Sequence, residues 1–441
     1  MYEAVSFLDR NLPNGSDHHW ENTIVFVMSA HKLRCLATLA LSFLALLAFR
    51  DPPKIGAGEI RAGNNYCQEI NDPESGSNLV LEPGEYKGPC KIFRGGEVGD
   101  PLVIRALDAS NPPRIHYDGS HGNVFEIYAG NITIKGLEFG PTKSEVDGIR
   151  IFSGHSITIE NCKFSNMGGI AVVANHLSAR KLTVRQNEIV NSRSTAMYFG
   201  CHDASCVMSD LLIEKNFISG VSAPDPQIGY GIQFKLNSSG IVRDNVVIDL
   251  KGPGIMVYGA TDSNAISIVE RNFVSGSRAS AGIVVGGGPA RVWNNIVVSN
   301  HEGGISLEDY ANRGLLKGIV VAHNTAYNNK DGGILVRAEG SVEATLAYNA
   351  IASPKQVSNI SARQTGIRMF ENGDCSSVNC FVNPEQNNFT PLDNPPLLRT
   401  KKRDNFKSRP VDDYFGRRRS AHPAIGAIEP PGGVIRMEIK H

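Results

Sequence analysis

The sequence carries no net charge, few aromatic residues and no apolar run long enough to span a membrane. Its 44 Lys and Arg residues balance 44 Asp and Glu residues, so no overall field attracts nucleic acid or an anionic membrane. An acidic ligand must therefore be held by a local patch. Glycine, in contrast, is abundant: 45 of 441 residues are glycine, which indicates a turn-rich chain dominated by β-structure.

The amino terminus has the pattern of an export signal. Lys32 and Arg34 precede an uncharged, mostly apolar stretch at residues 36–49, which is shorter than the about 20 residues of a membrane span. We expect residues 1–27 to be a spurious extension before Met28, and residues 28–58 to be a signal peptide. The mature protein is expected to begin between Phe49 and Gly63, to have no stable membrane span and to be secreted or periplasmic. A short uncleaved anchor is the alternative.

The cysteines outside the signal form three closely spaced pairs and one single residue. The pairs are Cys67 with Cys90, Cys201 with Cys206, and Cys375 with Cys380. Such pairs predict disulfides in an oxidising compartment. A metal site is the alternative, although no pair has the two-residue spacing of a zinc motif. Cys162 is expected to be a buried free thiol.

A repeat of about 27 residues runs through most of the chain. Its main signature is an asparagine after alternating apolar residues, at Asn161, Asn187, Asn216, Asn245, Asn272, Asn295, Asn324 and Asn349. A second signature, a small residue followed by an apolar one, lies between these asparagines, as in Gly231-Ile232. Repeated short strands without helical periodicity predict stacked β-coils. An asparagine at one turn of every coil can bond to its equivalents above and below, which predicts an asparagine ladder.

With these motifs the chain resembles the secreted right-handed parallel β-helix proteins of the pectate-lyase type, over about residues 64–430. Residues 79–86 and 99–106 look like the first coil of alginate-lyase-like members, polysaccharide lyase family six, and residues 413–417 and 425–429 look like a closing segment. The resemblance implies an all-β protein: a single right-handed parallel β-helix of about eleven coils at residues 64–370. A loop-rich, irregular tail would follow at residues 371–441, and a monomer is expected.

In that family the first strand of each coil, here the one with the Gly-Ile signature, lines the substrate groove with its outer face. Side chains alternate along a strand, so two outward columns follow. The first is predicted to run Arg150, Ala171, Tyr198, Gln233, Met256, Val284, Ser306, Leu335, Arg368. The second is predicted to run Phe152, Val173, Gly200, Lys235, Tyr258, Gly286, Glu308, Arg337, Phe370.

Polar and aromatic residues gather in the middle of these columns. Tyr198, Gln233, Lys235 and Tyr258 are predicted neighbours, Gly200 leaves an opening beside Lys235, and the disulfide-closed segment with His202 would form a rim. Ordinary solvated residues on a strand face give the same pattern, so both interpretations stay open.

The functional interpretation is eliminative cleavage of a uronic-acid polysaccharide. Elimination requires a neutralised carboxylate, a base and an acid for the leaving oxygen. Lys235 matches the family-six catalytic lysine and is followed by Asn237, Ser238 and Ser239, which implies the base. Tyr258 stands where that family has an arginine, and a tyrosine can act as the acid. Candidate substrate-binding residues are Tyr198, Gln233, Arg150, Arg337 and His202.

No cofactor is required by the sequence, but Ca²⁺ could neutralise the carboxylate. It needs six to eight oxygen ligands, and the candidates are Asp225, Glu308 and Asp309. Hydrolysis needs two facing carboxyl groups, and the outward columns contain only Glu308.

The sequence thus predicts an exported β-helix protein that cleaves or binds an acidic polysaccharide and binds no nucleic acid. If the chain is an enzyme, a polysaccharide lyase is expected. A non-catalytic carbohydrate-binding or structural β-helix protein is the alternative.

Overall fold

The computed structural model describes residues 57–60, 65–309, 314–393, 400 and 408–438. The predicted extension, the signal peptide up to residue 56 and most of the predicted range for the mature amino terminus lie outside the described residues. Within the described part, no helix is both long and apolar enough to cross a membrane.

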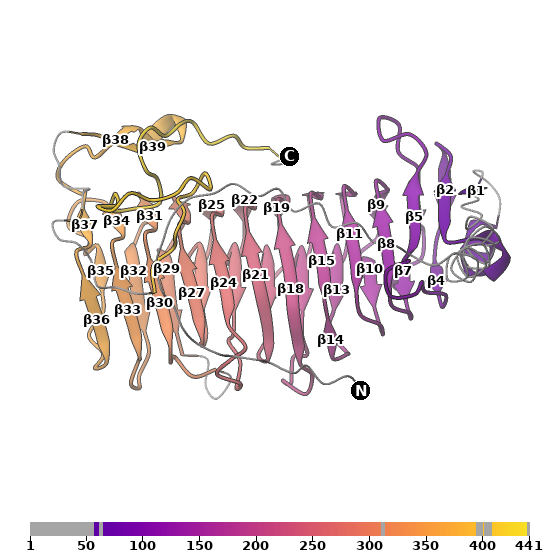
Figure 1. The fold of residues 1–441 in the computed structure, drawn as a ribbon, viewed down its shortest axis with the longest axis horizontal. Helices are drawn as coiled ribbons and strands as arrows, with labels where there is room; N and C mark the ends of the chain where they lie inside the picture. Colours follow the sequence, from indigo (N-terminus) through magenta and orange to yellow (C-terminus); the bar gives the residue numbers. More distant parts are fainter. Residues whose placement is uncertain (1–56, 61–64, 310–313, 394–399, 401–407, 439–441) are drawn as a thin grey trace, which may run out of the picture. The chain divides into compact units, whose positions relative to one another are not determined.

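The described chain forms a β-helix of three parallel sheets (Figure 1). In each full turn, or coil, the chain visits the 11-stranded sheet, then the 14-stranded sheet, then the 12-stranded sheet. Each strand pairs in parallel with its equivalents in the neighbouring coils, such as β17 with β13 and β20. The predicted single right-handed parallel β-helix is therefore confirmed.

The strands of the 11-stranded sheet carry the predicted groove. They are β4 (Cys90–Ile92), β7 (Gly122–Ile127), β10 (Val146–Ile151), β13 (Val172–Ala174), β17 (Met197–Phe199), β20 (Ile232–Phe234), β23 (Ile255–Val257), β26 (Ile283–Val285), β29 (Gly303–Glu308), β32 (Gly332–Arg337) and β35 (Ile360–Ser361).

The 14-stranded sheet follows in each coil. It contains β1 (Ala57–Ile60), β2 (Asn78–Leu81), β5 (Leu102–Ala106), β8 (Ile132–Lys135), β11 (Ile157–Glu160), β14 (Ala179–Arg180), β15 (Leu182–Arg185), β18 (Met208–Glu214), β21 (Ser238–Arg243), β24 (Ser267–Glu270), β27 (Ala290–Trp293), β30 (Ile319–Ala322), β33 (Ala344–Ala347) and β36 (Ile367–Phe370).

The 12-stranded sheet completes each coil. It contains β3 (Glu85–Lys87), β6 (Arg114–Tyr117), β9 (Glu138–Thr142), β12 (Lys163–Ser165), β16 (Glu188–Val190), β19 (Phe217–Val221), β22 (Val246–Leu250), β25 (Phe273–Ser277), β28 (Ile296–Val298), β31 (Thr325–Tyr327), β34 (Ala350–Ala352) and β37 (Gly373–Asp374). Outside the three sheets lie α2 (Tyr66–Asn71), the 3-10 helices η1 (Pro73–Ser75) and η2 (Pro384–Gln386), and an antiparallel pair, β38 (Phe381–Asn383) with β39 (Asn388–Pro391).

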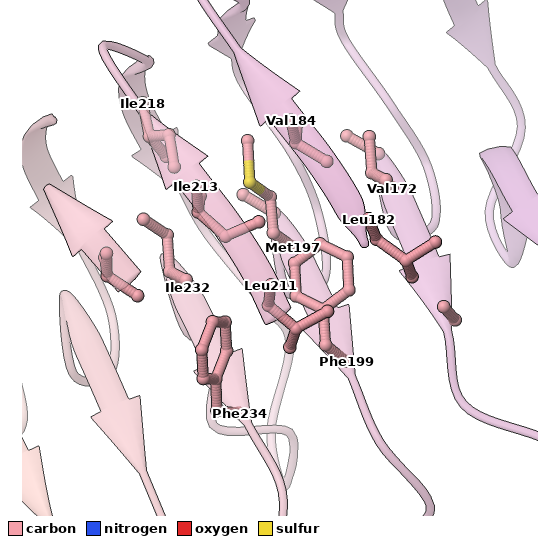
Figure 2. Packing of buried hydrophobic residues seen from close by; sticks show 14 of the residues in the cluster. Val172, Leu182, Val184, Met197, Phe199, Leu211, Ile213, Ile218, Ile232 and Phe234 are labelled. Atoms are coloured by element: carbon pink, nitrogen blue, oxygen red, sulfur yellow. The ribbon is translucent and has the colours of Figure 1, made fainter. Parts of the chain in front are cut away.

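Apolar side chains fill the interior between the three sheets. In β17 and β20, Met197, Phe199, Ile232 and Phe234 are fully buried and point inward (Figure 2). Each such side chain contributes about 1.5–3 kcal/mol by leaving water. Because alternate residues are inside, the residues between them stand on the outer face of the sheet.

The asparagine ladder is present, with one correction. It runs through Asn187, Asn216, Asn245, Asn272, Asn295, Asn324, Asn349 and Asn372, whose side-chain amides donate to the next Oδ1 at 2.8–3.0 Å. The prediction for Asn161 was wrong, because Cys162 occupies that position and donates its backbone N–H to Asn187. Asn161 instead has a φ of 52°, a left-handed conformation that asparagine tolerates.

Two parts of the predicted outward columns were also wrong. Val173, and not Ala171, lies between Arg150 and Tyr198, because the strand starts two residues after the Gly-Ile signature. Arg368 and Phe370 belong to β36 of the 14-stranded sheet, so they do not extend the groove.

The three predicted disulfides are confirmed. They join Cys67 to Cys90, Cys201 to Cys206, and Cys375 to Cys380. Cys162 is a buried free thiol, as predicted, and burial raises its pKa to about 12.

The irregular tail packs on the outside of the coils. Tyr414 and Ile428 pack in one apolar cluster with Phe273 and Ile296, which belong to the 12-stranded sheet. Arg419 of the tail is buried, and it pairs with Glu429 of the tail at 3.1 Å and donates to Asn294 of the coils at 2.6 Å.

A buried histidine under this tail predicts acid sensitivity. The ring of His323 stacks on Tyr348 and lies 3.1 Å from the carbonyl oxygen of Ala424. Burial, and then the positive charge of Arg419, hold the pKa of His323 well below its ordinary value. His323 therefore binds a proton less readily in the folded protein than in the unfolded chain. As a result, the free energy of unfolding should fall as the pH drops below about 6.5.

We expect this loss to reach about 1.4 kcal/mol per pH unit for one proton. Urea unfolding between pH 7.5 and 5.5 should show a flatter pH dependence for His323→Gln than for the parent. His121→Gln, at an exposed histidine, is the matched control and should keep the parent slope. An unchanged slope in His323→Gln would contradict the assignment.

Candidate functional site

The floor of the candidate site is formed by β17, β20 and β23, which are neighbours in the 11-stranded sheet. Tyr198 of β17 pairs with Gln233 of β20, and both side chains stand on the outer face because the residues flanking them are inside. Lys235 directly follows β20, and Tyr258 directly follows β23. The fold thus brings the four predicted neighbours together.

Lys235 lies between two tyrosine rings. Its Nζ is 4.5 Å from the ring centroid of Tyr258 and 5.6 Å from that of Tyr198, within the range of cation–π attraction. Although it belongs to the outer face, Lys235 is only 4% exposed, and Tyr258 is 3% exposed. The sequence predicted an outward lysine with little burial. Its ammonium instead packs against the two tyrosine rings.

Gly200 provides the space beside Lys235, as predicted. A Cβ at this position would lie 3.0 Å from the Cβ of Lys235 and 2.1 Å from the Oγ of Ser238. Its φ of 98° is also one that side chains with a Cβ rarely adopt. Any larger residue would therefore displace Lys235 or the backbone that carries it.

These residues line one cavity of about 750 Å³, a size typical of small-ligand sites. Its lining consists of Ile170, Ser194, Thr195, Tyr198, His202, Pro226, Gln227, Ile228, Gly229, Tyr230, Gln233, Lys235, Tyr258 and Asp309. Six predicted site residues are among them: Tyr198, His202, Gln233, Lys235, Tyr258 and the calcium candidate Asp309. The sequence analysis missed Thr195 and Tyr230. Tyr230 directly precedes the Gly231-Ile232 signature, so its position beside the groove strand was the available signal.

The two predicted arginines lie outside this cavity. Arg150 is on β10, three strands from β20, and its guanidinium donates to Asn123, Asn175 and Asp147. Arg337 is on β32, four strands from β20 in the other direction, and pairs with Glu302 at 2.6 Å and with Asp331 at 3.3 Å.

The three predicted calcium ligands do not converge in the described part of the chain. Asp225 pairs with Lys251 at 2.5 Å, and the hydrogen bond and charge of that lysine lower the pKa of Asp225. Glu308 lies 3.9 Å from Arg337, whereas Asp309 lines the cavity. Among the described residues, no group of three or more His, Cys, Asp and Glu side chains is arranged to hold a metal ion.

The ionisable groups of the cavity bear on whether it could support glycoside hydrolysis. Asp309 is the one carboxylate among the described lining residues. Glycoside hydrolysis uses two carboxyl groups on opposite sides of the bond, so this lining does not supply a hydrolytic pair. It supplies an amine, three phenols, an imidazole and two side-chain amides, which are proton-transfer and hydrogen-bonding groups.

Comparisons with solved structures found several similar folds. One is an alginate lyase from Paenibacillus sp. str. FPU-7, with 17% identity, 70% of this chain and 99% of that chain covered, and a TM-score of 0.47. Another is a PL6 family polysaccharide lyase from Pseudopedobacter saltans, with 15% identity, 72% and 92% coverage and a TM-score of 0.50. A third is a mannuronan C-5 epimerase A-module from Azotobacter vinelandii, with 13% identity, 73% and 93% coverage and a TM-score of 0.47.

At these identities the structural matches show the fold alone. A comparison of the sequence with curated proteins found no match. The family model described as "Right handed beta helix region" matches residues 114–210 and 208–382, which is more than half of the chain. The chain therefore belongs to the right-handed β-helix family.

Proposed function

We propose that the protein binds an acidic, uronate-containing polysaccharide on the outer face of the 11-stranded sheet and cleaves it by β-elimination. The observation that carries the proposal is the pairing of Lys235 and Tyr258, 4.5 Å apart from ammonium to ring, in one cavity. The cavity's amide, imidazole and phenol groups match the hydroxyls and carboxylate of a uronate sugar.

In the proposed reaction Lys235, as the free amine, removes the proton from the carbon next to the carboxylate. Electrons of that C–H bond form the new carbon–carbon double bond, and the bond to the glycosidic oxygen breaks. Tyr258 donates its phenolic proton to that oxygen. Gln233 and His202 bind the carboxylate, which stabilises the negative charge that develops there.

The predicted signal peptide and the three disulfides support an exported protein, since disulfides persist in oxidising compartments. An exported protein would have access to extracellular polysaccharide. The proposal therefore includes secretion or transfer to the periplasm.

The test is a substrate panel. Alginate, pectate and glycosaminoglycans should be incubated with the purified protein, and a neutral glucan should serve as the control. We expect ultraviolet absorbance from a conjugated double bond to grow with one acidic polymer and not with the glucan. If no acidic polymer in the panel gives this absorbance, the elimination proposal is wrong.

One observation favours a second candidate, a non-catalytic binding protein. Contacts with two tyrosine rings favour the charged ammonium of Lys235, and this form pairs with a carboxylate but cannot accept a proton. A protein of this kind would bind an acidic polymer in calorimetry, yet produce no unsaturated product.

A further inference from the structure

The segment from Asp225 to Tyr230 forms one wall of the cavity that Lys235 also lines. Five of its six residues, those from Pro226 onward, line the cavity. Tyr230 packs in an apolar cluster with Tyr258, while Ile228 is 48% exposed at the outer rim. Lys235 is only 4% exposed. The position of this wall therefore affects how much of its amine a reagent can reach.

One lysine of the following turn holds this segment. The Nζ of Lys251 lies 2.5 Å from Oδ1 of Asp225 and donates to the carbonyl oxygen of Gln227 at 2.6 Å. Lys251 lies between β22 and β23, in the turn that leads into the strand before Tyr258. The contact therefore joins the cavity wall to the connection that precedes the proposed acid.

The next residue fits closely beneath the same segment. Gly252 donates its backbone N–H to the carbonyl oxygen of Gly229 at 3.0 Å. A Cβ on Gly252 would lie 2.6 Å from the side chain of Ile228 and 2.8 Å from its carbonyl oxygen. The backbone can thus approach closely here, which brings Lys251 within reach of Asp225 and Gln227.

We infer that Lys251 is a positioning residue, which latches the segment Asp225–Tyr230 in place as the cavity wall beside Lys235. The side chain of Asp225 is 94% exposed, and exposed ion pairs contribute little to stability. Loss of this latch should therefore loosen the wall without unfolding the protein. This inference rests on the proposed function only in its effect on turnover.

The test measures how accessible Lys235 is. The full-length protein is treated briefly with an amine-acetylating ester, and acetylation at Lys235 is quantified by peptide mass spectrometry. We expect Lys251→Ala to raise the acetylation rate of Lys235 about two- to five-fold. This range corresponds to the small free energy that an exposed ion pair contributes. Lys251→Arg keeps a donor and should restore protection. Lys330→Ala, at an exposed lysine outside the cavity, is the matched control and should leave the rate unchanged.

A kinetic split adds a second readout. With an acidic polymer that is turned over, Lys251→Ala should raise KM two- to five-fold and change kcat less than two-fold, because the wall positions the sugar and takes no part in proton transfer. If Lys251→Ala does not fold, Asp225→Asn tests the same contact. Unchanged acetylation of Lys235 in both variants would overturn the latch. Faster acetylation without any turnover would leave the latch intact and count against the lyase.

Discussion

Replacing Lys235 with alanine should reduce formation of unsaturated product by at least about 100-fold, the usual contribution of a general base. Its amine is the basic group beside Tyr258 in the cavity, and none of the described lining residues is an arginine or a second lysine. Stability should change by less than about 2 kcal/mol, because loss of the cation–π contacts is offset by removal of a buried charge. Initial rates of absorbance and thermal unfolding measure the two effects.

Three further variants make this result specific. Lys235→Arg keeps the positive charge but cannot become a free base, so it should be as inactive as Lys235→Ala if Lys235 abstracts the proton. Tyr258→Phe should lower the rate strongly while weakening binding only modestly. Lys330→Ala should keep the parent rate. A Lys235→Ala protein that works at the parent rate would remove Lys235 from the mechanism.

Replacing Asn245 with alanine should lower the free energy of unfolding by about 3–5 kcal/mol. This residue is fully buried in the middle of the ladder. Its amide donates to Ile213 and Asn272 at 2.9 Å, and its Oδ1 accepts from the backbone and side-chain nitrogens of Asn216. Alanine leaves several of these buried groups without partners, and each costs about 1–3 kcal/mol.

Urea unfolding measures this loss. Asn264→Ala, at an exposed asparagine of a loop, is the control and should change stability by less than about 0.5 kcal/mol. A loss below about 1 kcal/mol for Asn245→Ala would mean that the ladder contributes little to the stability of the fold.

The fold could be predicted because every coil repeats the same pattern of buried apolar residues and turn asparagines. The apolar alternation and the ladder asparagines are local patterns, so a single sequence reveals them. The position of Cys162 in the ladder was not predicted, because it has no amide side chain. It contributes only its backbone N–H, which donates to Asn187, 25 residues away. Asn372 was missed at the last rung, in a coil whose first strand is only β35 (Ile360–Ser361).

The candidate site was predictable to the extent that strand alternation controls it. The predicted neighbours meet because they lie on, or directly after, three successive strands of one sheet, β17, β20 and β23. They are Tyr198, Gln233, Lys235 and Tyr258. The rest of the cavity lining depends on loops, which have no period. The contact between Lys251 and Asp225, across 26 residues, positions one cavity wall and gives no local pattern. Burial of Lys235 could therefore not be read from the columns.

Mass spectrometry of the products tests the central claim most directly. Elimination leaves a double bond at the new non-reducing end, so those fragments should be lighter by one water than hydrolytic fragments of the same length. We expect such unsaturated fragments from one acidic polysaccharide of the panel with the parent protein, and none with Lys235→Ala. Saturated fragments only, or intact polymer bound without cleavage, would contradict the account.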